Sequence, residues 1–245
     1  MKIGIISDIH GNLEALKASL DFLEDKTDTI VSLGDIVGYG PDPETCVEIV
    51  SQKASILVRG NHEEYLVRDD MSALKETARL ALIWTKEHLP SSFIEGFKEW
   101  QEKVEKSGVL YAHASVSNPL FKYLVSIKSV SEEFSILQQN ICFVGHTHLP
   151  GGFKQSISDG KIETILPTFS GTLEVDIKQD YKYIINTGSV GQPRDGLPFA
   201  CVGIHDLEEQ TIVLHRITYP LKTTRDKIIK RGLPSILAKR IMQGI

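Results

Sequence analysis

The chain has 245 residues, of which 41% are hydrophobic and 24% are charged, and its formal net charge is −5. This length fits one large α/β domain or two small ones, and the apolar fraction is enough to bury a sizeable core. The negative net charge excludes an overall basic field that would recruit nucleic acid or an anionic membrane, so we expect neither as a stable partner.

The first half of the chain alternates strand and helix patterns. Short apolar runs predict strands at residues 3–7, 29–33, 55–58, 109–111 and 141–144. Asn12 is the expected N-cap of a helix with leucines at positions 13, 16, 20 and 23 on one face, and Asp42 and Pro43 open a second helix. Residues 72–106 predict two amphipathic helices that separate at Pro90, either as a helical cap that shapes a substrate pocket or in a packing role.

The pattern changes after Pro150. Short candidate strands at residues 162–166, 172–177, 182–186, 199–204 and 211–217 are separated by turn residues, which is typical of antiparallel pairing. Two amphipathic helices follow, with Gly232-Leu233-Pro234 between them. The elements predict an α/β fold in a single domain over residues 1–245, with a mostly parallel sheet packed on a more antiparallel one and helices outside.

The three cysteines, Cys46, Cys142 and Cys201, are far apart and form no CxxC pair. Free cysteines in apolar stretches behave as small hydrophobic residues, which favours a reducing compartment. The apolar run after Met1 is too short for a signal peptide, and no stretch approaches the roughly 20 apolar residues of a membrane helix. We therefore expect a cytoplasmic protein.

Residue types that bind metals follow five of the predicted strands. Asp8 and His10 follow the first strand, Asp35 the second, Asn61 and His62 the third, His113 the fourth, and His146 and His148 the fifth. In open α/β sheets, ligands bind outside the carboxyl ends of the strands. We therefore expect these side chains to gather at one sheet edge.

The combination indicates a centre of two divalent ions. Carboxylate, imidazole and amide oxygen suit Mn, Fe, Zn, Co or Ni, of which we expect Mn, and the lack of cysteine argues against a structural zinc site. Two ions about 3.5–4 Å apart are bridged by a carboxylate, and Asp35 is the expected bridge because a carboxylate has two oxygens. Each residue alone has an ordinary explanation, such as a core histidine or a helix cap, but the ordered series does not.

Together these motifs resemble the signature of the calcineurin-like metallophosphoesterases. The matching segments are Asp8-Ile9-His10, Gly34-Asp35, Gly60-Asn61-His62-Glu63, His113 and Gly145-His146-Thr147-His148. The run from Asn186 to Gly196 is similar to the small bacterial and archaeal phosphodiesterase branch and to relatives of diadenosine tetraphosphatases. The resemblance implies a two-sheet mixed β-sandwich flanked by helices, in the order αββα, which agrees with the predicted elements.

The resemblance also implies a role for each residue. Asp8, His10 and His148 would hold one ion, Asn61, His113 and His146 the other, and Asp35 would bridge them. His62 would not be a ligand and would stabilise or protonate the leaving oxygen. The implied reaction is in-line attack of a metal-bridging hydroxide on a phosphate ester, without a covalent phospho-enzyme.

The second motif departs from that of the protein Ser/Thr phosphatases in this superfamily. Gly38 stands where they have the carboxylate that orients the leaving-group histidine, and Tyr39 stands where they have the arginine that grips phosphate. The departure argues against a protein phosphatase. It leaves the orientation of His62 open, because Glu63 is too close in sequence to be assigned that role.

Two residues are candidates for substrate binding. Arg194 either binds phosphate oxygens bidentately, or pairs with Asp195, or lies in solvent. Tyr39 either stacks on a nucleobase beside the cleft or belongs to an ordinary turn before the second helix.

The leading hypothesis is a phosphodiesterase with two divalent ions per chain, acting on a small phosphorylated substrate, nucleotides included. The alternative is a dinucleoside polyphosphate hydrolase of the diadenosine tetraphosphate type. A third interpretation is a non-catalytic binding scaffold, and the presence of His62, His113, His146 and His148 argues against it. The sequence predicts no particular oligomeric state.

Overall fold

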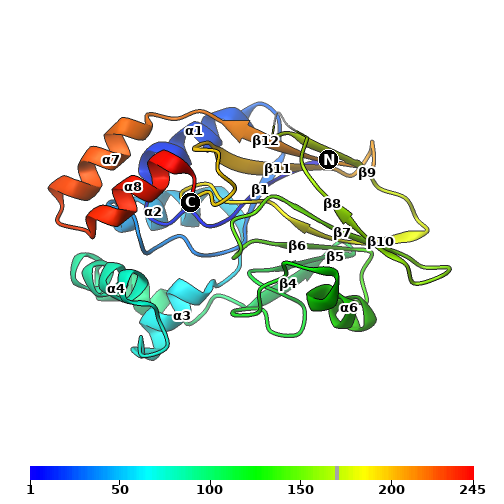
Figure 1. Cartoon of the computed structure of the whole chain (residues 1–245), viewed down its shortest axis with the longest axis horizontal. Coiled ribbons are helices and arrows are strands. Elements are labelled where there is room, and N and C mark those ends of the chain that lie inside the picture. Colours follow the sequence, from blue (N-terminus) through cyan, green and yellow to red (C-terminus); the bar gives the residue numbers. More distant parts are fainter. Residues whose placement is uncertain (169–170) are drawn as a thin grey trace.

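Two six-stranded sheets face each other in the computed structural model of the chain, which describes residues 1–168 and 171–245 (Figure 1). The first sheet consists, from edge to edge, of β3 (Ala54–Leu57), β2 (Thr29–Ser32), β1 (Lys2–Ile6), β11 (Ala200–Asp206), β12 (Thr211–Ile217) and β9 (Leu173–Asp176). The second consists of β4 (Lys103–Lys106), β5 (Val109–Ala112), β6 (Ile141–Val144), β10 (Tyr181–Asn186), β7 (Gly151–Ser156) and β8 (Ile162–Ile165). The helices are α1 (Leu13–Glu24), α2 (Pro43–Lys53), α3 (Asn61–Arg68), α4 (Glu76–His88), α5 (Ser91–Phe97), α6 (Ile127–Ile136), α7 (Leu221–Lys230) and α8 (Ser235–Gln243).

Both sheets are mixed, which corrects the expectation of one mostly parallel and one more antiparallel sheet. In the first, β1 pairs parallel with β2 and antiparallel with β11. In the second, β6 lies parallel to β5 and β10, and β7 pairs antiparallel with β10. The chain leaves β3 through three helices before β4 and β5, and this long connection carries it into the other sheet. The ligand-bearing strand ends are therefore shared between two sheets, three strands in the first and two in the second.

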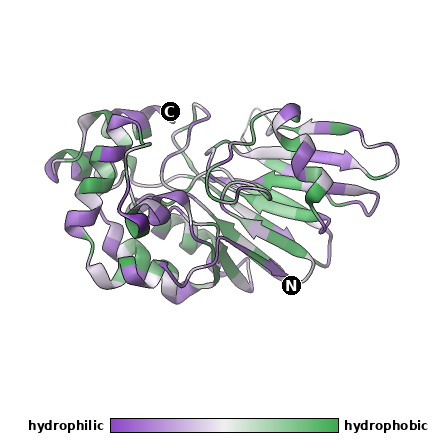
Figure 2. Cartoon of the chain, turned by 90° about the horizontal axis from the view of Figure 1, so that it is seen from below, coloured by the Kyte–Doolittle hydropathy of each residue, from purple (hydrophilic) through white to green (hydrophobic). Residues whose placement is uncertain are grey.

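Successive residues of the central strands face different cores, which gives the layered order. Ile5 of β1 packs between the sheets, and Ile6 packs against the outer helices. Phe143 of β6 lies in the core between the sheets, and Cys142 lies in the core under α6. Helix α1 contacts β11 and β12, and α6 contacts β7 and β8. The order is helix, sheet, sheet, helix, as expected, and Figure 2 shows hydrophobic residues along the strands in the middle.

The first two helices begin where the sequence predicts, but the Asp42 side chain bonds to another helix and does not cap its own. The Asn12 side chain accepts a hydrogen bond from the Ala15 backbone N–H at 3.2 Å, so it caps α1 as predicted. Helix α2 begins at Pro43, but the Asp42 side chain makes no capping bond. Its carboxylate instead accepts a hydrogen bond from Lys227 of α7 at 2.8 Å, which ties α7 to the start of α2.

The segment 72–106 is helical only in part. Helices α4 and α5 are separated at Pro90 as predicted, but residues 103–106 form the edge strand β4, which pairs antiparallel with β5. This run has one apolar residue, Val104, among charged neighbours, so its period does not separate strand from helix; charged side chains are typical of an edge strand. Helix α6 and strand β7 lie where we predicted no element.

Each of the three cysteines is a buried free thiol, in line with their expected role as small core residues. Burial raises the pKa of the Cys201 thiol to about 12, so it stays protonated. Within residues 1–168 and 171–245, no helix has the length and apolar character needed to cross a bilayer.

A core histidine makes stability depend on pH. His205 of β11 is buried beside Phe143, with 5.5 Å between ring centroids, and burial lowers its pKa from 6.5 to about 4. Between these values the unfolded chain binds a proton that the folded chain excludes, so stability falls as pH falls, by about 3 kcal/mol in all. We expect His205→Leu to reduce the pH dependence of urea unfolding between pH 6.5 and 4, to which the buried His10 and His146 also contribute. The exposed-residue control His88→Gln should keep the wild-type slope, and an unchanged slope in His205→Leu would contradict the assignment.

Candidate metal centre

All seven predicted metal ligands are buried and meet where strands of the two sheets end. Asp8 and His10 follow β1, Asp35 follows β2, Asn61 begins α3, His113 follows β5, and His146 and His148 follow β6. The expectation of one sheet edge is corrected to the carboxyl ends of strands from two facing sheets. Because the two sheets face each other, they bring ligands from opposite sides, and protein encloses the centre on both of these sides.

The first group of ligands consists of Asp8, His10 and His148, whose ligand atoms lie within 4.8 Å of one another. The Nε2 atoms of His10 and His148 are 3.2 Å apart, and Asp8 Oδ1 lies 3.2 Å from His148 Nε2. The second group consists of Asp35, His113 and His146 within the same limit. His113 Nε2 lies 3.2 Å from His146 Nδ1 and 2.9 Å from Asn61 Oδ1, which adds the amide to this group.

Asp35 lies between the two groups. Its Oδ2 is 3.8 Å from His10 Nε2 and 3.3 Å from His113 Nε2. Its Oδ1 accepts a hydrogen bond from the His62 backbone N–H at 2.8 Å. One oxygen, Oδ2, therefore faces both groups, whereas the sequence argument assigned the bridge to both oxygens of the carboxylate.

Hydrogen bonds from Nδ1 to backbone carbonyls orient three of the histidine rings so that Nε2 faces the centre. His10 Nδ1 donates to the Val37 carbonyl at 3.0 Å, and His113 Nδ1 donates to the Leu33 carbonyl at 2.9 Å. His148 Nδ1 pairs in the same way with the Gln192 carbonyl. A histidine that donates through Nδ1 and is neutral presents a lone pair at Nε2, as a metal ligand must. Two such lone pairs 3.2 Å apart repel each other unless a cation lies between them, so these residues fit divalent ions.

The electrostatics also favour cations. Burial lowers the pKa of His146 to about 3 and holds the pKa of His10 well below its ordinary value, so both stay neutral. Burial opposes ionisation of Asp35, but His113 and His62 outweigh it and hold the Asp35 pKa well below the usual range. Burial likewise opposes a charge on His113, but the Asp35 carboxylate raises its pKa to about 9. A positive charge is therefore stabilised at this point.

Backbone conformation at the centre is unusual for residues with side chains. Asp8, His10, Asp35, His146 and His148 all have positive φ, between 49° and 64°. Residues other than glycine in this left-handed region cost of order 1–3 kcal/mol each and cluster at functional sites. The sharp turns aim several ligands from short strand ends at the same point.

Glu63 holds two ligand segments together. Its buried carboxylate accepts hydrogen bonds from the backbone N–H groups of Asp35, Ile36, Val37 and Gly60, at 2.8–3.1 Å. The sequence argument gave Glu63 no role. A glutamate at the third position of a helix that follows Gly60 is a capping signal, and it could have been recognised.

A cavity of about 440 Å³ opens from the centre. Asp35, Asn61, His62, His146 and His148 form its floor. The aromatic side chains that line it are Tyr39, Tyr65, Phe121 and Tyr123, and the cationic ones are Lys75, Arg194 and Arg240. The cavity thus places a polar and aromatic chamber directly over the candidate metal centre.

The family model of the calcineurin-like phosphoesterase superfamily domain matches residues 1–210 of the chain. The chain belongs to this superfamily. It is a metallophosphoesterase, a hydrolase of phosphate esters, as the motifs indicated.

Similar proteins span the whole chain. An uncharacterised protein of Methanocaldococcus jannaschii is 34% identical over 249 residues, covering 99% of this chain and 98% of that protein. The crystal structure of a metallophosphoesterase from Sphaerobacter thermophilus is 34% identical, with a TM-score of 0.87, and the match covers 100% of this chain and 99% of that one. A hypothetical protein from Pyrococcus horikoshii OT3 shares the fold at 18% identity and a TM-score of 0.79, covering 100% and 98%. The expected family and αββα fold are confirmed.

In this metallophosphoesterase, packing orients His62, which answers the question left open by the sequence. Its ring lies 4.7 Å from the rings of both His10 and Tyr39. A Cβ atom on Gly38 would fall 2.1 Å from His62 Nδ1, so the imidazole fills the space that a side chain at position 38 would need. His62 Nε2 is 3.9 Å from Asp35 Oδ2, close enough that distance alone also permits His62 as a ligand.

We expect Gly38→Ala to lower turnover by about 10²-fold, because the new methyl group must displace the His62 ring. The matched control is Gly108→Ala. Gly38 and Gly108 have similar positive φ values, 84° and 75°, but a Cβ atom on Gly108 meets no atom within 4 Å. Turnover should be measured at saturating metal, and equal losses in the two variants would show that backbone strain, not contact with His62, is responsible.

Arg194 and Tyr39 both line the cavity, as expected for substrate-binding residues. Arg194 donates to Gln192 Oε1 at 2.9 Å, whereas Asp195 pairs with Arg216, so the predicted alternative of an Arg194–Asp195 pair does not hold. Tyr39 occupies a left-handed turn before α2, as in the second alternative, and its ring packs against His10 beside the cavity. Stacking on a nucleobase stays a prediction.

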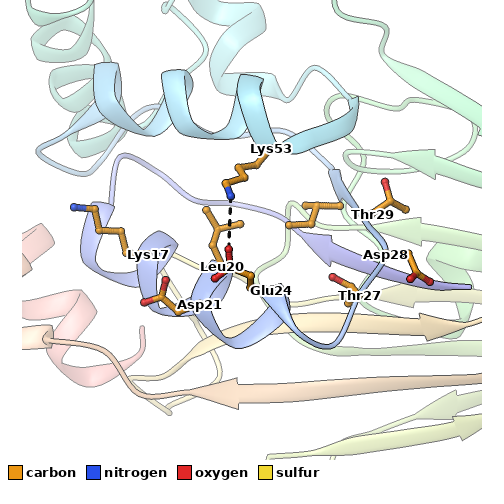
Figure 3. Close-up of a pocket in the computed structure, with 9 residues that line it drawn as sticks. Lys17, Leu20, Asp21, Glu24, Thr27, Asp28, Thr29 and Lys53 are labelled. Atoms are coloured by element: carbon orange, nitrogen blue, oxygen red, sulfur yellow. Dashed lines mark ion pairs between the residues drawn. The ribbon is translucent and has the colours of Figure 1, made fainter.

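Sequence reasoning missed Lys75, Tyr65 and Arg240 as cavity residues. Arg240 lies in α8, outside every motif, and no spacing rule connects it to the strand ends. A different hollow of about 340 Å³ lies between α1 and α2, where Lys53 and Glu24 pair at 4.0 Å (Figure 3). Its lining has mixed charge and contains none of the predicted ligands.

Proposed function

We propose that this metallophosphoesterase hydrolyses phosphodiesters at a centre of two divalent ions, with Mn the preferred metal. The observation that carries the proposal is the position of Asp35 Oδ2 between two groups of buried ligands, at 3.8 Å from His10 Nε2 and 3.3 Å from His113 Nε2. Asp8, His10 and His148 would hold one ion, Asn61, His113 and His146 the other, and Asp35 both. When bound, such ions polarise phosphate oxygens and lower the pKa of water.

The chain's own residues supply the remaining steps. His62 donates a proton or a hydrogen bond to the leaving oxygen, which stabilises the developing alkoxide. Its Nε2 lies on the Asp35 side of the ring, at the floor of the cavity. Arg194 binds oxygens of the substrate phosphate, and Tyr39 closes the cavity beside His62. Residues 72–106 shape one wall as a partial helical cap, since Lys75, Thr77 and Ala78 line the cavity.

A screen of phosphodiesters, phosphomonoesters and dinucleoside polyphosphates, with Mn, Fe, Zn, Co or Ni added, tests the proposal. We expect the highest kcat/KM with a phosphodiester such as bis(p-nitrophenyl) phosphate and with Mn. A strong preference for monoesters would replace the phosphodiesterase by a phosphomonoesterase. No hydrolysis by protein that binds two ions would favour the scaffold interpretation.

A dinucleoside polyphosphate hydrolase remains the second candidate. The observation that favours it is the aromatic wall of Tyr65, Phe121 and Tyr123, where Tyr123 is half exposed and lies 4.1 Å from the His146 ring, between ring centroids. Aromatic rings stack on nucleobases. In the same screen, this function predicts that diadenosine tetraphosphate outcompetes simple diesters.

Arg194→Ala is expected to raise KM by about 10-fold or more, with a smaller loss of kcat, because a charge-assisted hydrogen bond to ground-state phosphate is removed. The matched control is Arg79→Ala, which removes an arginine of α4 that pairs with Glu76. Steady-state kinetics at saturating metal measure both constants. Unchanged kinetics in Arg194→Ala would show that this arginine is an ordinary loop residue.

A further inference from the structure

The cavity over the metal centre is far more cationic than the chain as a whole. The chain has a formal net charge of −5, yet Lys75, Arg194 and Arg240 all line this cavity. Among the described lining residues the single carboxylate is Asp35, which the proposed metal centre uses. Charge of one sign gathered in a cleft attracts a ligand of the opposite sign. The excess of positive charge is more than one phosphate group requires.

The two arginines reach the cavity from segments that are fixed to each other. Arg194 comes from the loop after β10, and Arg240 comes from α8. The Gly196 backbone N–H donates to the Gly244 carbonyl at 2.8 Å, which joins this loop to the end of α8. The two arginines therefore come from joined segments and line the same cavity, and the pKa of Arg240 is lowered by burial and by the nearby Arg194.

Neither guanidinium pairs with an aspartate or glutamate side chain among the described residues. Arg194 donates to the neutral Gln192 amide, and its Nε is buried without a hydrogen-bond partner in that part of the chain. Arg240 Nε donates to a main-chain oxygen of Ile245, the last residue of the sequence, at 2.9 Å. Two neighbouring guanidinium groups repel each other, so this arrangement is costly unless an anion lies between them.

The position of Arg194 relative to His62 indicates which kind of anion binds here. Arg194 Cζ lies 6.0 Å from the centre of the Tyr39 ring, and that ring lies 4.7 Å from the His62 ring. The Arg194 guanidinium is thus about one aromatic ring away from the histidine proposed to serve the leaving group, and Arg240 lines the same cavity. We infer that Arg240, near Arg194, forms a second phosphate subsite, so that the preferred substrate carries a phosphate group besides the one that is hydrolysed and that Arg194 contacts. This inference rests on the proposed phosphoesterase function and narrows its substrate class.

Matched ligands test the subsite. Dithymidine monophosphate has one phosphodiester, and its 5′- or 3′-phosphorylated forms add one phosphate on either side of the same bond. Adenosine 5′-monophosphate and 5′-diphosphate form a second pair, in which the added phosphate is joined by an anhydride. Each is used as a competitive inhibitor of bis(p-nitrophenyl) phosphate hydrolysis at a fixed free Mn concentration. We expect an added phosphate to lower Ki about 10-fold or more in one of the two series, and the series that responds gives the spacing between the phosphates.

Arg240→Gln should reduce that ratio of Ki values to about one, and Arg240→Lys should restore part of it, because lysine keeps the charge and loses the bidentate fork. The control is Lys239→Gln, which removes a positive charge from the exposed position of α8 directly before Arg240. It should keep the wild-type ratio of Ki values. Thermal unfolding of each variant establishes that α8 is intact.

The outcomes separate the two proposals. Absence of any phosphoesterase activity overturns the proposed function. Hydrolysis of bis(p-nitrophenyl) phosphate together with a Ki ratio of one in both series leaves that function standing and overturns the subsite. A ratio that persists in folded Arg240→Gln also overturns it, because the added phosphate is then bound elsewhere.

Discussion

Replacing His62 with alanine is expected to lower turnover by ~10²–10⁴-fold while metal content and fold are preserved. The reason is the position of His62 beside a ligand. Asn61 Oδ1 lies 2.9 Å from His113 Nε2, whereas the adjacent His62 ring packs between His10 and Tyr39 at the cavity floor. Asn61 and His62, neighbours at the start of α3, therefore have different proposed roles, and the loss of His62 should remove the proposed proton donor while the proposed metal ligands stay in place.

The loss should depend on the leaving group. Alkyl and nucleoside alkoxides are strong bases and need a proton, whereas p-nitrophenolate leaves without one, so alkyl esters should suffer much more than nitrophenyl esters. Asn61→Ala is the matched control, because it should lose metal while His62 stays in place. Equal losses on both ester types, with metal still bound, would show that His62 positions phosphate. Loss of metal in His62→Ala would show that it is a ligand, as its distance from Asp35 permits.

Asp35→Asn is expected to weaken both metal sites and to lower turnover by about 10³-fold or more, the effect of losing several kcal/mol of charge stabilisation. Asp35 Oδ2 is the one ligand atom of the described residues that faces both groups, so no other carboxylate there replaces it. Elemental analysis after reconstitution with Mn should give about two equivalents in the wild type and fewer than one in the variant.

Asp206→Asn serves as the control for this substitution, because Asp206 is also a buried carboxylate but pairs with Lys2 at the far end of β11. It should retain both ions. If Asp35→Asn loses only one ion, Asp35 belongs to a single site and the bridge is assigned wrongly. A wild-type protein that reaches full activity with one equivalent would refute the dinuclear centre itself.

The sequence predicted which side chains gather at the candidate site better than it predicted the architecture around them. Asp8, Asp35 and His146 each follow a short apolar run, and that local pattern survives whichever sheet the strand joins. The division of the strands between two sheets depends on contacts such as β6 with β10, between residues about 40 positions apart, and no local period encodes them. The sequence predicts helix at β4 for a related reason, because an exposed edge strand has little apolar pattern.

The cavity residues were predictable only where they lay inside a motif. Arg194 stands in a recognisable glycine-rich run, but Arg240 comes from an amphipathic helix whose pattern reports its packing against α7 and not its charged face. Gly38 shows a related limit. The sequence shows that the carboxylate of the protein phosphatases is absent there, and the structure adds that the absent side chain makes room for the His62 ring.

The left-handed backbone at Asp8, His10, Asp35, His146 and His148 has a consequence for the durability of the protein. Glycine would relieve the strain at any of these positions, but it would delete a ligand, so evolution towards higher thermostability is blocked there by function. The surrounding fold offsets this strain, and ions bound at the proposed centre would stabilise the folded form further. A cell starved of transition metals would then hold this protein in a less durable form, more readily degraded, and its abundance would follow the metal supply together with its activity.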